Sequence, residues 1–285
     1  MKILIVGASG MIGSAVMCVL SKSKDLEVYG SIRDEGVKEF FSPAIKSRLI
    51  SGIDLLNSDS LLKLFESISP QIVINCAGIT KHKLGASNPL VSLPINSLMP
   101  HRIALICGLI NARLIHISTD CVFSGGTGNY DETDSPDAID LYGKSKELGE
   151  VNYPHAITLR TSTIGHEFKS SLGLLEWFLS QKISCKGYIN AIFSGLPTVV
   201  LADIIREVII PHPSLSGLYH VGARKINKFE LLKMIAKEYQ KKIEIRCDES
   251  LIIDRSLDSS KFEAATGYVA PEWPKMISLM HSYKY

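Results

Sequence analysis

This 285-residue sequence has no excess of one charge, with 31 lysines and arginines against 29 aspartates and glutamates and a formal net charge of +2. The basic residues are scattered, so the chain lacks the electrostatic footprint of a DNA- or RNA-binding protein, and a nucleic acid partner is disfavoured. It also lacks a Cys-x-x-Cys pair, since its six cysteines lie far apart and mostly in apolar surroundings. We therefore expect reduced core thiols in a cytoplasmic protein.

Membrane and metal signals are missing as well. No apolar run approaches the roughly 18 residues that a membrane span needs, so we expect no membrane partner and no targeting segment. The histidines lack metal-ligand spacing, and the acidic stretch from Asp131 to Asp134 is typical of a solvated loop, so no metal site is predicted. His116 is expected to be a satisfied core histidine. What is present is 46% apolar content, enough for a full hydrophobic core.

Strand-like and helix-like segments alternate through the first part of the chain. Apolar, β-branched runs typical of buried parallel strands occupy residues 2–8, 26–32, 71–78, 112–119 and 155–162. Helical spacing of apolar residues is found over 10–22, 58–68, 95–111 and 141–151. We predict an α/β fold: a Rossmann-type doubly wound parallel sheet over 1–165 and a smaller mixed α/β substrate lobe over 166–285. The lobe should pack beside the open edge of the sheet, with possible chain crossovers between the two parts.

The first predicted strand ends in "IVGASGMIG", where Gly7, Gly10 and Gly13 lead into a predicted helix. In a dinucleotide-binding turn the first glycine permits the tight turn, the second lets backbone approach a pyrophosphate, and the third allows close helix–strand packing. The helix N-terminus, which begins with Met11 and Ile12, then attracts the phosphates. Because the motif follows the first strand of an alternating pattern, we predict a nicotinamide dinucleotide site. The alternative is a glycine-rich turn without a ligand.

The residues after the second predicted strand indicate which dinucleotide is bound. NAD-preferring enzymes usually place an acid there to hold the ribose hydroxyls, whereas a basic residue suits a 2′-phosphate. This chain has Ser31 and Arg33, which favours NADPH, although Asp34 and Glu35 lie close enough to leave NADH open. Arg33 has the alternative explanation of a solvated charge at a strand end.

Two further segments are expected to contact the cofactor. Asp54 and Leu55, in "GIDLLNSDS", follow a further short strand, the third in the chain, which is expected between 26–32 and 71–78; such folds commonly meet the adenine there. Cys76, Ala77 and Gly78 follow the fourth strand. Their small side chains are consistent with backbone that passes close to the cofactor.

Residues 118–146, "STDCVFSGGTGNYDETDSPDAIDLYGKSK", join the fifth predicted strand to the next helix. Tyr142 and Lys146 are four residues apart, so they share a helix face and the ammonium can lie near the phenol. A free phenol titrates near pH ~10, but a nearby cation and a positively charged nicotinamide favour the phenolate and make it a usable acid or base near neutrality. Ser118 or Thr119 adds a hydroxyl for a substrate carbonyl. A Tyr-x-x-x-Lys pair alone usually reflects packing, but after the glycine motif it predicts carbonyl reduction.

These motifs resemble the extended short-chain dehydrogenases/reductases and, within them, the dTDP-4-dehydrorhamnose reductase (RmlD-type) family. The likeness covers nearly the whole chain, through "GASGMIG", "STDCVFSG", "YGKSKELGE", "LRTS", "GLPTVVLADI", "GLYHVGA" and "RSLDSSKFEAATG". It implies NADPH or NADH as cofactor and a C-terminal lobe that closes over a nucleotide-diphosphate sugar. It also implies a catalytic triad, in which Tyr142 donates the proton, Lys146 tunes it and contacts the ribose, and Thr119 binds the sugar oxygen.

Departures from the family pattern bear on the substrate. Thr163 in "LRTSTIG" replaces an expected aromatic residue, and Lys81–His82 in "CAGITKHK" resembles UDP-N-acetylhexosamine dehydratases. The implied substrate is a 4-keto-6-deoxy sugar, either dTDP-4-dehydrorhamnose or an N-acetylated UDP-sugar, in deoxysugar and polysaccharide biosynthesis. The expected substrate-binding residues are Lys81, His82, Asn96, Asp120, Val122 and Thr163. The competing explanations are ordinary loop residues for Lys81–His82 and an N-cap-type residue for Asn96.

Two other functions stay open. A nucleotide-sugar epimerase or dehydratase uses the same tyrosine and lysine but keeps NAD tightly bound; Asp120 after Thr119 occurs in both classes and does not decide. A reductase-like fold of this kind is also known as a non-catalytic partner of methionine adenosyltransferase, and the intact Tyr142 and Lys146 argue against that role. The superfamily likeness also implies a possible homodimer.

Overall fold

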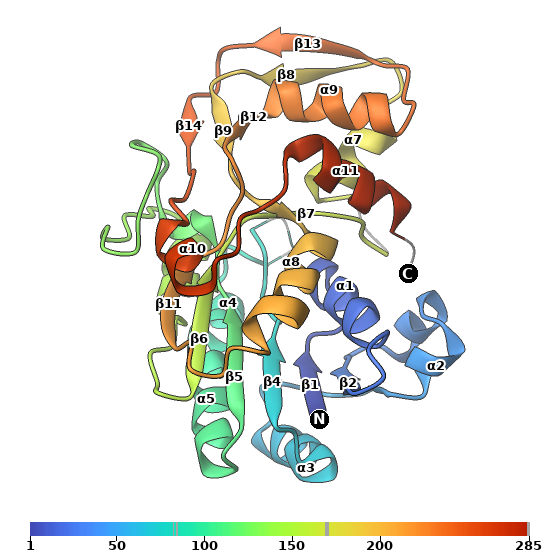
Figure 1. Ribbon diagram of the computed structural model, residues 1–285, viewed down its shortest axis with the longest axis vertical. Coiled ribbons are helices and arrows are strands. Elements are labelled where there is room, and N and C mark those ends of the chain that lie inside the picture. Colours follow the sequence, from blue (N-terminus) through green and yellow to red (C-terminus); the bar gives the residue numbers. More distant parts are fainter. Residues whose placement is uncertain (82, 84, 169–170, 284–285) are drawn as a thin grey trace.

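The large sheet of the protein, seen in a computed structural model, has seven parallel strands in the order β11-β6-β5-β4-β1-β2-β3 (Figure 1). The structure describes residues 1–81, 83, 85–168 and 171–283. The strands are β1 (Lys2–Val6), β2 (Glu27–Ser31), β3 (Leu49–Ile50), β4 (Ile72–Asn75), β5 (Arg113–Ile117), β6 (Ala156–Arg160) and β11 (Gly217–His220). The strand order turns back on either side of β1, the arrangement of a doubly wound Rossmann-type sheet, so the predicted fold class is confirmed.

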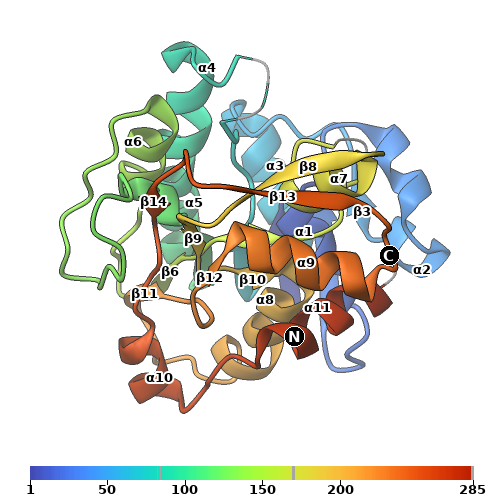
Figure 2. The same cartoon turned by 90° about the horizontal axis from the view of Figure 1, so that it is seen from above.

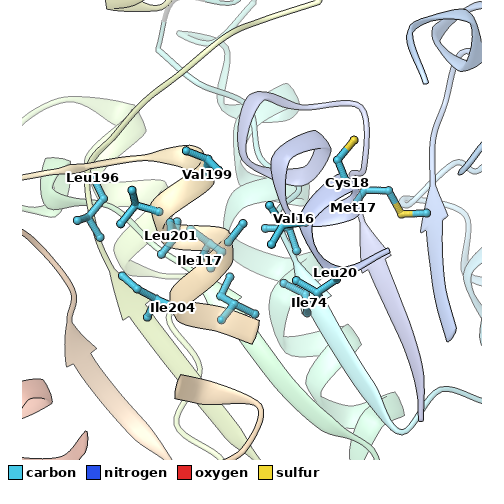
Figure 3. Packing of buried hydrophobic residues seen from close by; sticks show 14 of the residues in the cluster. Val16, Met17, Cys18, Leu20, Ile74, Ile117, Leu196, Val199, Leu201 and Ile204 are labelled. Atoms are coloured by element: carbon cyan, nitrogen blue, oxygen red, sulfur yellow. The ribbon is translucent and has the colours of Figure 1, made fainter. Parts of the chain in front are cut away.

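The central strands are apolar because helices cover both faces of the sheet (Figure 2). One face packs against α1 (Met11–Leu20) and α8 (Thr198–Ile204), which continues as a π-helical turn, Ile205–Ile209. Figure 3 shows Val16 of α1 and Leu201 of α8 meeting Ile74 and Ile117 of the sheet. The other face packs against α3 (Ser58–Ile68) and α5 (Met99–Leu109).

Helix α3 illustrates how local sequence fixes an element. Its buried side chains Leu61, Leu64, Phe65 and Ile68 recur at the spacing of one helix face. Asn57 caps the N-terminus by accepting a hydrogen bond from the backbone N–H of Ser60. The helix ends where the C-cap residue enters the left-handed region at φ 50°. The apolar stripe therefore lies against the sheet.

One helical run corrects the expectation that no segment is long and apolar enough to cross a membrane. It comprises α4 (Pro89–Leu93), a π-helical turn (Pro94–Leu98) and α5, and has a mean hydropathy of 1.3 over its apolar window. Ile103 and Cys107 of this run are buried against the sheet. A core helix of a folded protein meets the same test of length and composition, so the run is weak evidence for a membrane span.

The remaining elements form a smaller mixed lobe and the connections to it. We expected the lobe beside the open edge of the large sheet. It lies instead over the carboxyl ends of the strands (Figure 1). Its strands form three small sheets: β10-β7, β12-β9-β14 and β13-β8. The bounds are β7 (Thr163–Ile164), α7 (Leu174–Ser180), β8 (Ser184–Tyr188), β9 (Ala191–Phe193), β10 (Leu196–Pro197), β12 (Ile226–Asn227), α9 (Lys228–Glu238), β13 (Glu244–Asp248), β14 (Ile253–Asp254), α10 (Ser260–Thr266) and α11 (Trp273–Ser282).

The chain crosses back into the large sheet after it has entered the lobe. Strand β11 pairs with β6, with Leu218 opposite Thr158, and α8 packs beside α1. Both elements lie beyond residue 165, so the sheet and its helical cover do not end at the predicted boundary between 1–165 and 166–285. Part of the sequence after residue 165 therefore belongs to the large sheet and its helical cover.

Short elements complete the loops at the carboxyl ends of the strands. They are a 3₁₀ helix at Glu35–Phe40, α2 (Pro43–Lys46), a 3₁₀ turn at Asp120–Val122 and α6 (Leu141–Glu147). The last two carry the sequence that predicted carbonyl reduction.

Candidate active site

The turn between β1 and α1, Gly7–Gly13, which we call the glycine turn, is fixed by close backbone contacts. Gly7 has φ +82°, a conformation that favours glycine, and a Cβ there would lie 2.9 Å from backbone of Ala77. A Cβ on Gly13 would lie 2.2 Å from the carbonyl oxygen of Gly7. At Gly10 the nearest atom to an added Cβ would be 3.5 Å away. The first and third glycines are therefore required by the fold, while a Cβ on the second would make only an ordinary van der Waals contact.

The first turn of α1 has the properties of an anion site. Gly10 is the N-cap and has no side chain to occupy the free backbone N–H groups. Gly10 is exposed, and Met11 and Ile12 are half-buried. These residues fit a dinucleotide pyrophosphate because the helix is ten residues long and its N-terminal N–H groups stay open to a ligand.

The loop after β4 lies against the glycine turn. Asn75 accepts a hydrogen bond from the backbone N–H of Ala77 at 3.1 Å, and its amide nitrogen contacts Nδ1 of His116 at 3.0 Å. The ring of His116 is fully buried, and its Nε2 has no hydrogen-bond partner among the described residues. His116 is thus only half satisfied, which corrects the expectation of a satisfied core histidine. Cys76 and Gly78 are half-buried beside this loop.

Arg33 and Asp34, which follow β2, have different surroundings. Asp34 caps the following 3₁₀ helix by accepting a hydrogen bond from the backbone N–H of Gly36 at 2.9 Å. Arg33 is exposed and forms no ion pair within the described part of the chain. Asp54 accepts from the backbone N–H of Leu56 at 3.0 Å, and the half-buried Leu55 packs on the core. The guanidinium of Arg33 is therefore available to an anionic ligand.

Tyr142 and Thr119 are brought together by close packing of α6 on the 3₁₀ turn Asp120–Val122. Asp140 caps α6 by accepting from the backbone N–H of Gly143 at 2.7 Å. A Cβ on Gly143 would lie 2.2 Å from the carbonyl oxygen of Cys121, so a larger residue would push the helix away. The Thr119 hydroxyl, which donates to Asp120 Oδ1 at 3.2 Å, consequently lies near enough to the Tyr142 phenol to lower its pKa.

Lys146 joins α6 to the end of β5. Its side chain is buried, and Nζ donates to the carbonyl oxygen of Ile117 at 2.7 Å. Burial lowers the pKa of Lys146 to about 8, and the nearby Glu150 and Cys76 oppose this shift. The ammonium and the neutral amine are therefore both accessible near physiological pH.

The pKa of Tyr142 is shifted upward, opposite to the direction that we predicted. Burial raises the pKa of the phenol above its ordinary value, with Cys121 adding to the increase and the Thr119 hydroxyl opposing it. The pairing with Lys146 led us to expect a lowered value. Since the phenolate loses its hydration in this site, Tyr142 is held as a phenol, the form that can donate a proton.

Three cations act on Asp120 or Cys121, the residues that follow Thr119, where the sequence had indicated only Lys81. Lys81, Lys228 and Arg255, which we call the cation cluster, all act electrostatically on Cys121 or Asp120. Arg255 donates through Nε to the carbonyl oxygen of Phe123 at 2.7 Å. Lys228 lies at the start of α9 and Arg255 lies after β14. Arg255 opens the motif "RSLDSSKFEAATG", whereas Lys228 carried no sequence signal.

Burial disfavours the charged forms of both Lys228 and Asp120. Desolvation lowers the pKa of Lys228, and the charge of Lys81 lowers it further. Burial raises the pKa of Asp120, although Arg255 and the Ser162 hydroxyl oppose the increase. Lys228 forms no ion pair within the described ranges. The cluster therefore carries more positive charge than the protein neutralises.

Two residues expected to bind substrate have other roles. The side chain of Val122 is fully buried in a small cluster with Phe123, Tyr130 and Leu257, because the 3₁₀ turn points it inward. The side-chain amide of Asn96 donates to the carbonyl oxygen of Ile79 and to the Ser145 hydroxyl, both at 3.0 Å, and accepts from the Ile79 backbone N–H at 2.8 Å. Val122 packs the core, and Asn96 fixes the loop after β4 on α6.

The other expected substrate residues are distributed around the site. Thr163 is half-buried in β7, where it pairs with Leu196 of β10. Lys81 is exposed on the loop after β4, and His82 lies outside the described residues. No group of three or more His, Cys, Asp or Glu side chains that could hold a metal occurs in the described ranges.

Comparisons with known proteins bear on the whole chain. Residues 1–282 match the family model of the RmlD substrate binding domain. The chain is 34% identical over 166 residues to the probable low-salt glycan biosynthesis reductase Agl14 of Haloferax volcanii, an alignment that covers 56% of this chain and 52% of that protein. It thus spans about half the length of this relative.

Two other proteins resemble it over more of their length. The methionine adenosyltransferase 2 subunit beta of Rattus norvegicus is 30% identical over 251 residues, which is 84% of this chain and 72% of that protein. The crystal structure of dTDP-4-dehydrorhamnose reductase from Bacillus anthracis in complex with NADP superimposes with a TM-score of 0.80 and 22% identity, covering 98% of each chain. At that identity the structural likeness supports the shared fold.

Proposed function

Because the chain belongs to the RmlD substrate binding domain family, we propose that it is an NADPH-dependent reductase of the C4 ketone in a nucleotide-diphosphate-linked 4-keto-6-deoxy sugar. The observation that carries this proposal is the convergence of Tyr142, Thr119 and Lys146 at the carboxyl end of β5. The site lies two strands from the glycine turn in the sheet order. Ligands of open parallel sheets bind at this edge.

The residues of the cofactor side fit a phosphorylated dinucleotide. The open first turn of α1 would hold the pyrophosphate, and the exposed Arg33 would meet a 2′-phosphate while Asp34 is used as a helix cap. When bound, the reduced nicotinamide supplies a hydride to the ketone carbon. The Lys146 amine would contact the ribose.

The catalytic side chains then have separate tasks. Tyr142 donates a proton to the developing alkoxide, for which its raised pKa keeps the phenol protonated. Thr119 orients the ketone oxygen by hydrogen bonding. Protonated Lys146 stabilises the phenolate that Tyr142 leaves behind. The cation cluster of Lys81, Lys228 and Arg255 would hold the diphosphate, because it concentrates positive charge next to the sugar position.

One comparison tests the reaction and the nucleotide together. The purified protein is incubated with NADPH and, in parallel, with dTDP-linked and UDP-linked 4-keto-6-deoxy sugars, and absorbance at the nicotinamide band is followed. Oxidation of NADPH with one of them supports the proposal and identifies the nucleotide. Copurified oxidised NAD without net consumption of NADPH would instead indicate an epimerase or dehydratase.

A regulatory subunit is the second candidate, favoured by the 30% identity to a methionine adenosyltransferase beta subunit. The Tyr142–Thr119 contact and the buried Lys146 are intact, which supports catalysis. Absence of turnover with every ketosugar, together with co-elution with a methionine adenosyltransferase, would favour the regulatory role.

A further inference from the structure

A buried ion pair lies directly behind the catalytic lysine. Arg160, at the end of β6, binds Glu150 through two parallel hydrogen bonds, each of 2.8 Å. Only 4% of the Arg160 side chain and 13% of the Glu150 side chain are exposed. Ser118 donates its hydroxyl to the same carboxylate at 2.7 Å. Three hydrogen bonds therefore hold Glu150 in one position.

The partners of Arg160 keep the arginine in place from the other side. Its guanidinium stacks over the Phe123 ring at 5.1 Å from the centroid, and it approaches Nε2 of His220 at 3.3 Å. Burial and the charge of Arg160 lower the pKa of His220 to about 4, so the ring is neutral. Its Nδ1 then donates to the carbonyl oxygen of Tyr130 at 3.0 Å, which leaves Nε2 to accept from the guanidinium.

The same strand end carries the Lys146 contact. Lys146 donates to the carbonyl oxygen of Ile117, and Ser118, the next residue, is tied to Glu150. Glu150 also acts on Lys146 through its charge. The carboxylate thus affects both the backbone that receives the ammonium and the ammonium itself.

We propose that Glu150 is a positioning residue for the Lys146–Tyr142 pair, because its clamped carboxylate supplies the counter-charge that keeps Lys146 protonated in a buried site. Without it, Lys146 would lose its proton at a lower pH and could no longer stabilise the phenolate of Tyr142. Neither the ion pair nor Ser118 touches the reacting atoms, so the effect passes through the lysine.

The other groups around Lys146 do not replace this charge. From β4, the Cys76 thiol has its pKa raised to about 12 by burial, so it is uncharged near neutrality. From β5, His116 has its pKa lowered well below the ordinary value by burial and by Lys146 itself. From α6, Tyr142 is held as a phenol. Glu150, whose charge is partly offset by its ion pair with Arg160, is therefore the anion among the described groups that act on Lys146.

The test measures the titration of Lys146 directly. The protein is labelled with ¹³C-lysine, and the ¹³Cε resonance of Lys146, assigned by its loss in Lys146→Arg, is followed against pH. In Glu150→Gln the midpoint should fall by about one pH unit, the usual effect of removing a nearby opposite charge. The matched control is Glu147→Gln at the end of α6, three residues before Glu150, which removes the same charge and should leave the midpoint unchanged because Glu147 is not among the groups that shift the Lys146 pKa.

A second variant covers the case in which Glu150→Gln does not fold because Arg160 is left unpaired. In Glu150→Met/Arg160→Met both charges of the buried pair are replaced by apolar groups, which such sites often tolerate. Because the Arg160 cation leaves together with the carboxylate, the midpoint should fall by less than in Glu150→Gln, by about half a pH unit. An unchanged midpoint in the folded Glu150 variants, or an equal fall in Glu147→Gln, would overturn the proposal.

The catalytic consequence rests on the proposed reductase function, whereas the lysine titration does not. With an accepted ketosugar, kcat/KM of the wild-type protein should decline as the pH rises through about 8, because Lys146 then loses its proton. The decline should begin about one pH unit lower in Glu150→Gln. If no ketosugar is reduced, the function fails while the titration still decides the role of Glu150.

Discussion

The glycine turn of the cofactor end comes from one short run of sequence, whereas the sugar end is assembled from separate parts of the chain. The turn lies within a single strand–turn–helix segment, and its third glycine is fixed by the Gly7 carbonyl of the same segment. The cation cluster combines the loop after β4, the start of α9 and the segment after β14. The two ends meet at Tyr142, on α6.

The contrast between the glycine turn and the cation cluster indicates which residues of the site can change without affecting the rest. The glycine turn has almost no freedom, since an added methyl group at Gly13 meets backbone. The sugar end depends on side chains whose elements are set by the packing of the smaller lobe. A change of substrate is therefore expected at the second end while the first stays the same.

Replacing the residue where the two ends meet should have the largest effect. Tyr142→Phe keeps the ring and its packing but removes the proton donor, so kcat should fall by about 10²- to 10⁴-fold. NADPH binding, measured by fluorescence titration, should be unchanged. Wild-type turnover in this variant would show that Tyr142 is not the proton donor.

Two glycine variants separate the steric and binding roles within the cofactor end. Gly13→Ala should lower the free energy of unfolding by about 2–3 kcal/mol, because its Cβ overlaps the Gly7 carbonyl and backbone must move. In Gly10→Ala the added Cβ would make only an ordinary van der Waals contact. This variant should therefore keep the wild-type melting temperature and bind NADPH more weakly. Thermal unfolding and calorimetric titration measure both. Equal melting temperatures for the two variants would contradict this assignment.

A change in the cation cluster should affect only the sugar end. Lys228→Met should raise KM for the nucleotide sugar by about ten- to a hundredfold, the loss of one charge-assisted contact. Stability should not fall, because burial lowers the pKa of this amine and no ion partner is left behind. Lys237→Met, at the exposed far end of the same helix, is the control for charge. A raised Kd for NADPH in Lys228→Met would contradict the separation of the two ends.

The smallest effect is expected at Arg33. Arg33→Ser should weaken NADPH binding by about fivefold to tenfold and leave NADH binding unchanged, since an exposed charge is partly screened by solvent. Titrations with both nucleotides at low and moderate salt check this. Equal losses for NADPH and NADH would mean that Arg33 does not read the 2′-phosphate.

The same contrast explains what the sequence could predict. The strands of the large sheet and the glycine motif follow from local patterns, so "KILIVGASGMIG" indicated both. Val122 and Asn96 were expected to bind substrate, Asn96 because it resembles an asparagine of the family near the active site. Val122 is instead buried in a small apolar cluster, and the Asn96 amide bonds to the Ile79 backbone and the Ser145 hydroxyl. Lys228 and the direction of the Tyr142 pKa depend on how distant segments enclose the site, which no local pattern records.

Strand β11 has a consequence for how the chain folds. The strand supplies the edge of the large sheet beside β6, but residues 161–216, which include most of the first half of the smaller lobe, separate the two in sequence. During synthesis the sheet stays open at β6 until Gly217–His220 has left the ribosome. The nucleotide-binding part therefore cannot mature first as an independent N-terminal unit, and a fragment that ends at residue 165 would expose an unpaired edge prone to aggregation.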